Sequence, residues 1–448
     1  MNFDRIGEFV LAGQDMPQSA LNMAATLLID TVGVAAGAAR MEAGRIARDH
    51  AFAFHGAGAP EHAAHLMFDG RRASIPGAAF AAATQIDNLD AHDGLNPTKG
   101  HIGCAVVPAL FAFAEARPEL AARDALLALV MSYEVAARAA LVLHATVSDY
   151  HTSGAWNALG VAALGCRLMD ANPESLRHAL GIAEYHGPRS QMMREIANPT
   201  MLHDGSAMGA LVGSMAALMA QDGFAGAPAI TVEADDVARY WVDLGEVWTI
   251  EQNYIKPYPI CRWAHAALDA LSGLMCAHGF SADDVTRIEV NTFAEAAALF
   301  PDMPATTSQA QYSLSFALAA MLVHGRIGPG DISGAALSDP KVAEVLSRVA
   351  VREDALHSKR FPAGRWSDVS VTLKDGTRLA SGDVQARGGP EAPMKMSEVE
   401  AKFRVMAAEL PEPRVTALWE MRERLLQPEA KFSELAALVR ASAEETHV

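Results

Sequence analysis

Cysteine is scarce in this sequence, and the few cysteines are far apart. The 448 residues include only Cys104, Cys166, Cys261 and Cys276, and no two of them form a CxxC pair. Structural zinc sites and disulfide frameworks normally need closely spaced cysteines. The sequence therefore predicts neither kind of cross-link.

The common cofactor and nucleophile motifs are also missing. There is no GxSxG elbow, phosphate-binding loop or HExxH helix, and the pair Gly56 and Gly58 lacks the strand and helix of a dinucleotide-binding turn. These absences argue against nucleotide cofactors and serine-hydrolase chemistry. Proton transfer by His, Lys, Asp or Tyr at an acidic carbon is the chemistry that remains.

Positive charge is in deficit. Lys and Arg number 36 against 53 Asp and Glu, which gives a net charge of −17. Nucleic acid and anionic membranes are therefore poor partners, and an anionic small molecule would need a local basic pocket. The N-terminus has no basic segment followed by an apolar run, and we expect no 18-residue window apolar enough to cross a membrane. A soluble, cytoplasmic protein is expected.

Aromatic residues are few, so the apolar half of the chain consists mainly of small and aliphatic residues that favour helices. Helical spacing is expected over residues 20–37, 106–116, 121–146, 151–169, 174–183, 206–221, 262–275, 313–324 and 339–349. An alternating strand is expected over 285–292, and a hairpin with an Asp-Gly turn over 369–379. Ser397, three residues before Glu400, is expected to cap a final helix.

These patterns predict a mainly α protein with a smaller α+β domain. We expect a large all-helical domain built from both chain ends, residues 1–274 and 396–448, and an α+β lid domain over residues 275–395. The division follows the change from helical to alternating spacing after about residue 280.

The densest group of reactive side chains lies in residues 253–265. Lys256, Cys261 and Arg262 occur here, and Pro257 and Pro259 keep the backbone extended between them. Cations on a stiff arm before a helix suit a small anionic ligand. The alternative is a linker with incidental charges.

A second group occupies the polar loop 87–101, which ends an apolar helix. It contains Asp90, His92, Asp93, Lys99 and His101. Catalytic groups are often presented on such loops. The carboxylates and histidines are also a possible metal set, which the nearby Lys99 disfavours, and a solvated loop with helix caps is the third possibility.

Two further loops precede helices rich in Ala and Gly. In residues 149–154, His151 is a candidate for a cavity position, with Thr152 and Ser153 as helix caps. In residues 198–205, His203 is either a ligand contact or an ordinary histidine at a helix start.

In order and spacing, these segments resemble the MmgE/PrpD family over essentially the whole chain. The matching motifs are Leu89-Asp90 followed by His101 and Pro108, Tyr150-His151-Thr152 before Gly154, Leu202-His203-Asp204-Gly205, and Lys256-Pro257-Tyr258-Pro259. The resemblance implies a helical domain and a lid with the active site between them, a homodimer, and no metal or organic cofactor. It places Asp90, His101, His151, Lys256 and Cys261 at pocket positions.

The sequence departs from the family pattern at two positions. Thr200 stands where the family's dehydratases and decarboxylases usually have a Lys, and Cys261 stands where a His is common. In addition, the first loop is about one residue longer, which brings Lys99 next to His101. One wall of the pocket thus loses a cation and another gains one.

Together these features favour an enzyme that abstracts a proton α to a carboxylate of a small dicarboxylic acid, best described as an epimerase of the iminodisuccinate type. Lys99 and His101 would face His151 or a tyrosine, Tyr150 or Tyr258, while Lys256 and Arg262 would hold carboxylates. A lyase of the 2-methylcitrate dehydratase or cis-aconitate decarboxylase type is the alternative. A non-catalytic binding protein on the same fold is the second alternative.

Overall fold

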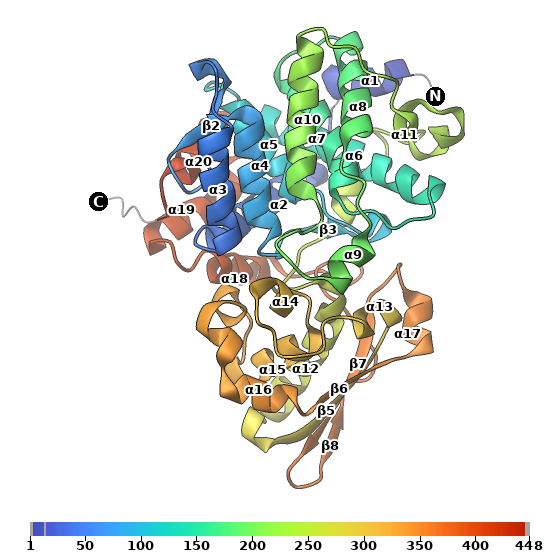
Figure 1. Ribbon diagram of the computed structural model, residues 1–448, viewed down its shortest axis with the longest axis vertical. Coiled ribbons are helices and arrows are strands. Elements are labelled where there is room, and N and C mark those ends of the chain that lie inside the picture. Colours follow the sequence, from blue (N-terminus) through green and yellow to red (C-terminus); the bar gives the residue numbers. More distant parts are fainter. Residues whose placement is uncertain (1–2, 13–14, 444–448) are drawn as a thin grey trace.

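The computed structural model describes residues 3–12 and 15–443, and it divides into an upper helical domain and a lower domain that contains a sheet (Figure 1). The first and the last described helices both lie in the helical domain, whose colours run from blue through green and return in red. This arrangement confirms the mainly α fold with a smaller α+β domain.

The helical domain is formed by helices of different length. From the N-terminal part these are α1 (Phe3–Leu11), α2 (Gln18–Ala38), α3 (Glu42–Phe54), α4 (Ile75–Asp87), α5 (Gly103–Ala114), α6 (Ala122–Thr146), α7 (Gly154–Leu168), α8 (Pro173–His186), α9 (Met192–Ala197) and α10 (Ser206–Gln221). The central ones, such as α5 and α7, are buried over most of their surface. Small residues let the helices approach closely. At Gly213 of α10, a Cβ atom would lie 2.4 Å from the carbonyl oxygen of Ala158 in α7.

The C-terminal helices α18 (Met396–Met406), α19 (Glu412–Arg424) and α20 (Phe432–Arg440) complete this domain. Phe403 of α18 packs on Gly33 of α2, where a Cβ atom would lie 2.5 Å from the ring. Lys402 is buried, and its Nζ donates to both carboxylate oxygens of Asp30 at 2.5 and 2.6 Å and to the carbonyl of Ala91 at 2.8 Å. The last helices are thereby fastened both to α2 and to the polar loop 87–101.

The lid domain is built on one mixed sheet. Its order is β6 (Val349–Glu353), β5 (Val285–Thr292), β7 (Trp366–Leu373) and β8 (Arg378–Ala380), and β9 (Val384–Gln385) also pairs with β7. The β5–β6 pair is parallel and the other pairs are antiparallel. The expected strand over 285–292 and the hairpin over 369–379 are both present, with Gly376 at a φ of +88° in the turn.

Helices cover the sheet and link it to the other domain. They are α12 (His265–His278), α13 (Ala294–Ala297), α14 (Thr307–Gln311), α15 (Leu314–His324), α16 (Pro340–Leu346) and α17 (Ala355–Arg360). α12 packs on β7 and α15 and lies in the lower domain in Figure 1. The expected division at residue 275 therefore falls inside a helix that packs with the lid.

Three local expectations are corrected by the structure. α18 begins at Met396, one residue before the expected cap Ser397, and the Glu398 carboxylate accepts the N–H of Lys395 at 2.8 Å. α7 begins at Gly154 without a side-chain cap from Ser153, whose hydroxyl is engaged elsewhere. The helix expected from residue 262 is a short 3₁₀ turn over Arg262–Ala264 followed by α12.

The expectation that no window is apolar enough to cross a membrane is also corrected. α2 and α6 pass that test by length and composition, with 83% and 89% of the relevant windows buried inside the structure. Core helices of soluble proteins have the same properties, because a helix surrounded by other helices is apolar on all sides.

Candidate active site

A small cavity lies between the two domains and collects most of the expected functional side chains. It is narrow, with about 20 Å³ of space open to water-sized molecules. Seven of the ten expected site residues line it: Asp90, Lys99, His101, Tyr150, Lys256, Cys261 and Arg262. Met192, Asp204, Tyr254, Trp263, Tyr312 and Arg365 complete the lining.

The polar loop 87–101 is held in place by the chain before the lid. Its β3 (Gly94–Leu95) pairs with β4 (Asn253–Tyr254) in an antiparallel register. From the lid, the Gln311 side chain donates to the carbonyl of Asn88 at 2.7 Å. Two distant segments therefore fix the loop.

Backbone strain is concentrated around the cavity. Five described non-glycine residues have a positive φ, and three of them, Asp90 (53°), Lys99 (54°) and Asp204 (45°), line the cavity. Each such conformation costs about 1–3 kcal/mol and persists only where the surrounding structure imposes it. Here the strained residues place three ionisable side chains around one small space.

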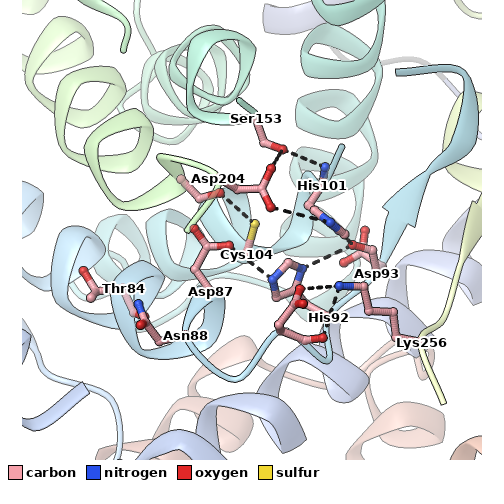
Figure 2. A network of polar contacts seen from close by, with 12 residues as sticks. Thr84, Asp87, Asn88, His92, Asp93, His101, Cys104, Ser153, Asp204 and Lys256 are labelled. Carbon is pink, nitrogen blue, oxygen red and sulfur yellow. Dashed lines mark hydrogen bonds and ion pairs between the residues drawn. The ribbon is translucent and has the colours of Figure 1, made fainter. Parts of the chain in front are cut away.

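His101 is oriented as a proton acceptor (Figure 2). Its Nδ1 lies 2.6 Å from the carbonyl oxygen of Asp93, which can only accept, so Nδ1 carries the proton of the neutral ring. Nε2 then carries a free lone pair and lies 3.7 Å from Asp204 Oδ2. Burial and the positive charge of Lys256 hold the pKa of His101 well below its usual value, so the ring is neutral at pH 7.

Asp90 and Lys256 form a buried ion pair. The Lys256 Nζ contacts Asp90 Oδ1 and also donates to the Asp90 carbonyl at 3.1 Å. Burial lowers the pKa of Lys256, but the attraction of Asp90 and other neighbours more than offsets this, and the net shift is upward. Lys256, expected on a stiff arm, is fully buried.

Two cations at the cavity have no carboxylate partner. Within the described part of the chain, no ion pair involves Lys99 or Arg365, and both line the cavity. The Lys99 Nζ lies 4.4 Å from the centre of the Tyr150 ring. Burial lowers the pKa of Lys99 and so does the charge of Arg365, while Glu295 acts in the opposite direction. Unpaired cations in a closed space form a site for anionic groups.

Arg262 has a more structural role than expected. Its two terminal nitrogens donate to the carbonyls of Arg387 at 2.7 Å and Ala386 at 3.0 Å. The guanidinium lies 4.2 Å from the centre of the Tyr254 ring, and its Nε has no partner among the described residues. One N–H of each terminal nitrogen is therefore engaged by a backbone carbonyl, which leaves fewer donors for a carboxylate.

The tyrosines of the cavity differ in their hydrogen bonds. Tyr150 donates to the carbonyl of Lys99, and Tyr312 donates to Glu195. The Tyr254 hydroxyl has no such bond within the described chain, and its ring lies edge-on to His101 at 6.2 Å between centres. Tyr254 is therefore the tyrosine whose hydroxyl remains free.

Three expected residues lie outside the cavity lining. The His151 backbone N–H donates to His144 at 3.3 Å, and the His203 Nε2 lies 3.4 Å from the Ser308 hydroxyl. Tyr258 donates to Asp269 at 2.9 Å and lines a different hollow on the lid side. Thr200, where the family pattern has a Lys, is exposed and also lies outside the lining.

Sequence reasoning missed Asp204, Tyr254 and Arg365. Asp204 follows His203 in the Leu202–Gly205 motif, in which the histidine carries the more obvious signal of a functional residue. Tyr254 sits two residues before Lys256 in the arm. Arg365 had no local signal, because no other lining residue is near it in the sequence and it reaches the cavity through the fold of the lid.

The carboxylates and histidines considered as an alternative metal set have other contacts. Asp90 is paired with Lys256, and the Asp93 carboxylate accepts from Tyr133 at 3.1 Å. Among the described residues, the potential ligand atoms that come within 4.8 Å of one another are those of Asp87, His92 and Cys104, and those of His357, Asp368 and Asp383. Neither group includes a residue that lines the cavity.

Removing the unpaired cations should weaken substrate binding. We expect Arg365→Met and Lys99→Met each to raise KM by about ten-fold or more, since a hydrogen bond to a charged group contributes about 1.5–3 kcal/mol. Steady-state kinetics on the acid identified as substrate measures this. Arg360→Met is a matched control, because Arg360 lies outside the cavity and pairs with Asp383 at 2.7 Å. Unchanged KM in both cavity variants would contradict an anion site here.

Comparison with known proteins supports the resemblance seen in the sequence. The model of the MmgE/PrpD N-terminal domain matches residues 5–244, and that of the MmgE/PrpD C-terminal domain matches residues 258–426. A human protein named cis-aconitate decarboxylase is 26% identical over 357 residues, which cover 74% of this chain and 73% of that protein. The mouse protein of the same name is 24% identical over 359 residues, with 74% and 72% covered.

Proposed function

Since the chain belongs to the MmgE/PrpD family, we propose that it transfers a proton at a carbon next to a carboxylate of a small dicarboxylic acid, without an organic cofactor. The main support is the neutral His101, whose Nε2 faces a closed cavity beside the unpaired cations Lys99 and Arg365. A neutral imidazole with a free lone pair, placed next to anion-binding groups, is suited to abstracting a proton from an anionic substrate.

In this proposal the cations bind the substrate, and the imidazole accepts the proton. Lys99 and Arg365 bind carboxylates, and His101 Nε2 takes the proton from the α-carbon. The electron pair spreads onto the adjacent carboxylate, where the positive charges stabilise it. Return of a proton on the opposite face inverts the carbon. We assign that step to Lys99, which lines the cavity and whose pKa is lowered by burial, and this supports an epimerase as the leading assignment.

A lyase is the second candidate, and the names of the relatives favour it, because both are cis-aconitate decarboxylases. Decarboxylation and dehydration also pass through a carbanion next to a carboxylate. The same base and the same cations would serve them, so the cavity alone does not separate the two reactions.

Proton NMR in heavy water separates these candidates. The protein is incubated with a panel of small di- and tricarboxylic acids, each as a single stereoisomer. Exchange at the α-carbon with formation of the other stereoisomer supports the epimerase, and new vinyl signals support the lyase. Absence of any change across the panel would contradict proton transfer and leave a binding protein as the alternative.

We also propose that the chain is a cytoplasmic homodimer, with the second copy on the face of α8 to α10. Large apolar side chains of these helices and of the loop before α10 are exposed: Tyr185, Met193, Met201, Leu202, Met208 and Met215, with Leu202 80% exposed. α8 and α10 pack side by side and lie at the front of the helical domain in Figure 1. Exposed apolar clusters of this kind are typical of subunit interfaces.

Charged substitutions on this face should separate the subunits. We expect light scattering to give twice 47.5 kDa for the unchanged chain and 47.5 kDa for Met208→Glu/Met215→Glu. Leu356→Glu, on the exposed face of α17 in the lid, is the matched control and should leave the dimer intact. A monomeric unchanged chain at micromolar concentration would contradict the assignment.

A further inference from the structure

Asp204 occupies an unusual position beside the proposed base. It lies in the loop before α10, lines the cavity, and its side chain is 5% exposed. Its φ of 45° and the following φ of 65° at Gly205 place two successive residues in the left-handed region. The backbone is held on both sides: the Asp204 N–H donates to Glu195 Oε2 at 2.8 Å, and its carbonyl accepts from Gly154 at 2.8 Å.

Ser153 links Asp204 to His101 (Figure 2). The Ser153 hydroxyl donates to Asp204 Oδ1 at 2.7 Å and accepts the backbone N–H of His101 at 2.9 Å. Its single proton is therefore committed to Oδ1. The second oxygen, Oδ2, faces His101 Nε2 at 3.7 Å and is the oxygen that remains for a substrate or a proton.

From this geometry we infer that Asp204 is a catalytic proton donor that works as a pair with His101. The inference rests on the proposed function and adds a residue to it. Asp204 and His101 lie on the same side of the cavity. Asp204 therefore donates its proton to an oxygen of the carboxylate next to the carbon that His101 deprotonates.

The C–H bond breaks, its proton goes to His101 Nε2, and the electron pair moves onto the neighbouring carboxylate. Asp204 gives its proton to the carboxylate oxygen that gains charge. Asp204 is then an anion beside the imidazolium of His101. When the carbon takes a proton from Lys99, the carboxyl proton returns to Asp204, and His101 and Lys99 re-equilibrate with solvent.

The surroundings allow Asp204 to hold a proton near neutral pH. Asp87, Asp90, Glu195, His92 and His101 face it from α4, the 87–101 loop and α9, and Tyr150 and Cys104 lie nearby. Burial and the charge of Asp87 raise its pKa to about 7, and the Ser153 bond acts against this rise. A buried carboxylic acid kept neutral in this way can donate to a developing oxyanion.

The pH profile of Asp204→Asn tests the inference. The amide keeps the acceptor for Ser153 but cannot release a proton. In the wild-type chain we expect a limb in the pH profile, a loss of activity as the pH rises through about 7 and Asp204 loses its proton. In Asp204→Asn we expect kcat to be lower by about 10²–10⁴-fold, KM to be nearly unchanged, and this limb to be absent. Ser153→Ala, which keeps the carboxyl, should retain this limb and move it to higher pH, because the Ser153 bond lowers the Asp204 pKa.

A second measurement does not depend on an active variant. Infrared difference spectra of the wild-type chain between about pH 5 and about pH 9 should show a protonated carboxyl band that is lost with a midpoint near 7, and Asp204→Asn should lack that component. Asp93 and Glu134, whose pKa values are also raised to about 7, contribute equally to both spectra.

The outcomes separate this inference from the proposed function. If the wild-type chain exchanges no α-proton on any acid of the panel, the proposed function fails. If the wild-type chain exchanges protons and Asp204→Asn keeps both the rate and the limb near pH 7, the proposed function stands and Asp204 is not the proton donor.

Discussion

His101→Gln should lower the rate of α-proton exchange by about 10²–10⁴-fold, which is the usual contribution of a positioned general base. The reason is geometric. The Asp93 carbonyl fixes the proton on Nδ1, so the base is the Nε2 atom that faces the cavity. Glutamine has a similar size but no basic nitrogen. NMR exchange in heavy water measures the change directly.

His151→Gln and His203→Gln are matched controls for this prediction. Both histidines were expected at the site, both are buried, and neither lines the cavity. We expect exchange in these variants to stay within a few-fold of the wild-type rate. Loss of exchange in His151→Gln with normal exchange in His101→Gln would reverse the assignment of the base.

The burial of His101 also predicts how the rate depends on pH. Because the pKa of His101 lies well below its usual value, the ring is already neutral at pH 7. Lowering the pH from 7 to about 6 should therefore cost little activity through this group, and the loss should come at lower pH as the ring takes up a proton. A rate profile with its acid limb at the usual histidine pKa of about 6.5 would contradict burial of the base.

Lys256→Met should destabilise the protein by about 3–5 kcal/mol, because it leaves the Asp90 carboxylate buried without its partner. Lys256 is fully buried and joins the lid side of the cavity to the 87–101 loop. Activity should fall as well, since the loop that carries His101 loses this support. Chemical denaturation gives the change in unfolding free energy.

The double variant Lys256→Met/Asp90→Asn separates the two effects. It removes both charges and should recover much of the lost stability without recovering activity. Lys431→Met provides a control, because Lys431 forms an exposed pair with Glu119 at 2.6 Å and such pairs contribute only about 0–1 kcal/mol. Equal stability of Lys256→Met and the wild-type chain would refute the buried-pair explanation.

Much of the local structure follows from short segments of sequence. Alternation over Val285–Thr292 specified a half-buried strand, and the Asp-Gly pair between two such runs specified the hairpin of β7 and β8. The residues at which helices begin were harder to predict. Ser153 has the side chain of a helix cap, but its hydroxyl bonds to Asp204, and that competing partner is invisible in the local pattern.

The site was only partly accessible from sequence. Asp90, Lys99 and His101 share one loop whose Gly and Pro content marks it as irregular, and Lys256 lies in an arm with two prolines. These residues could be recognised one segment at a time. Arg262 shows the limit of this reasoning, because its terminal nitrogens bond to the carbonyls of Ala386 and Arg387, more than a hundred residues away.

The sequence by itself determined the helical character of the chain, the strands of the lid, the family and the loops that bear the reactive groups. These depend on spacing and composition within short windows, which the sequence displays directly. Only the tertiary structure decided that Lys256 faces Asp90, that Tyr258, His151 and His203 lie outside the cavity, and that Asp204 and Arg365 lie in it. These positions depend on which side of each segment is buried when the two domains meet. Burial and charge pairing between distant residues leave no signal in a short stretch of sequence.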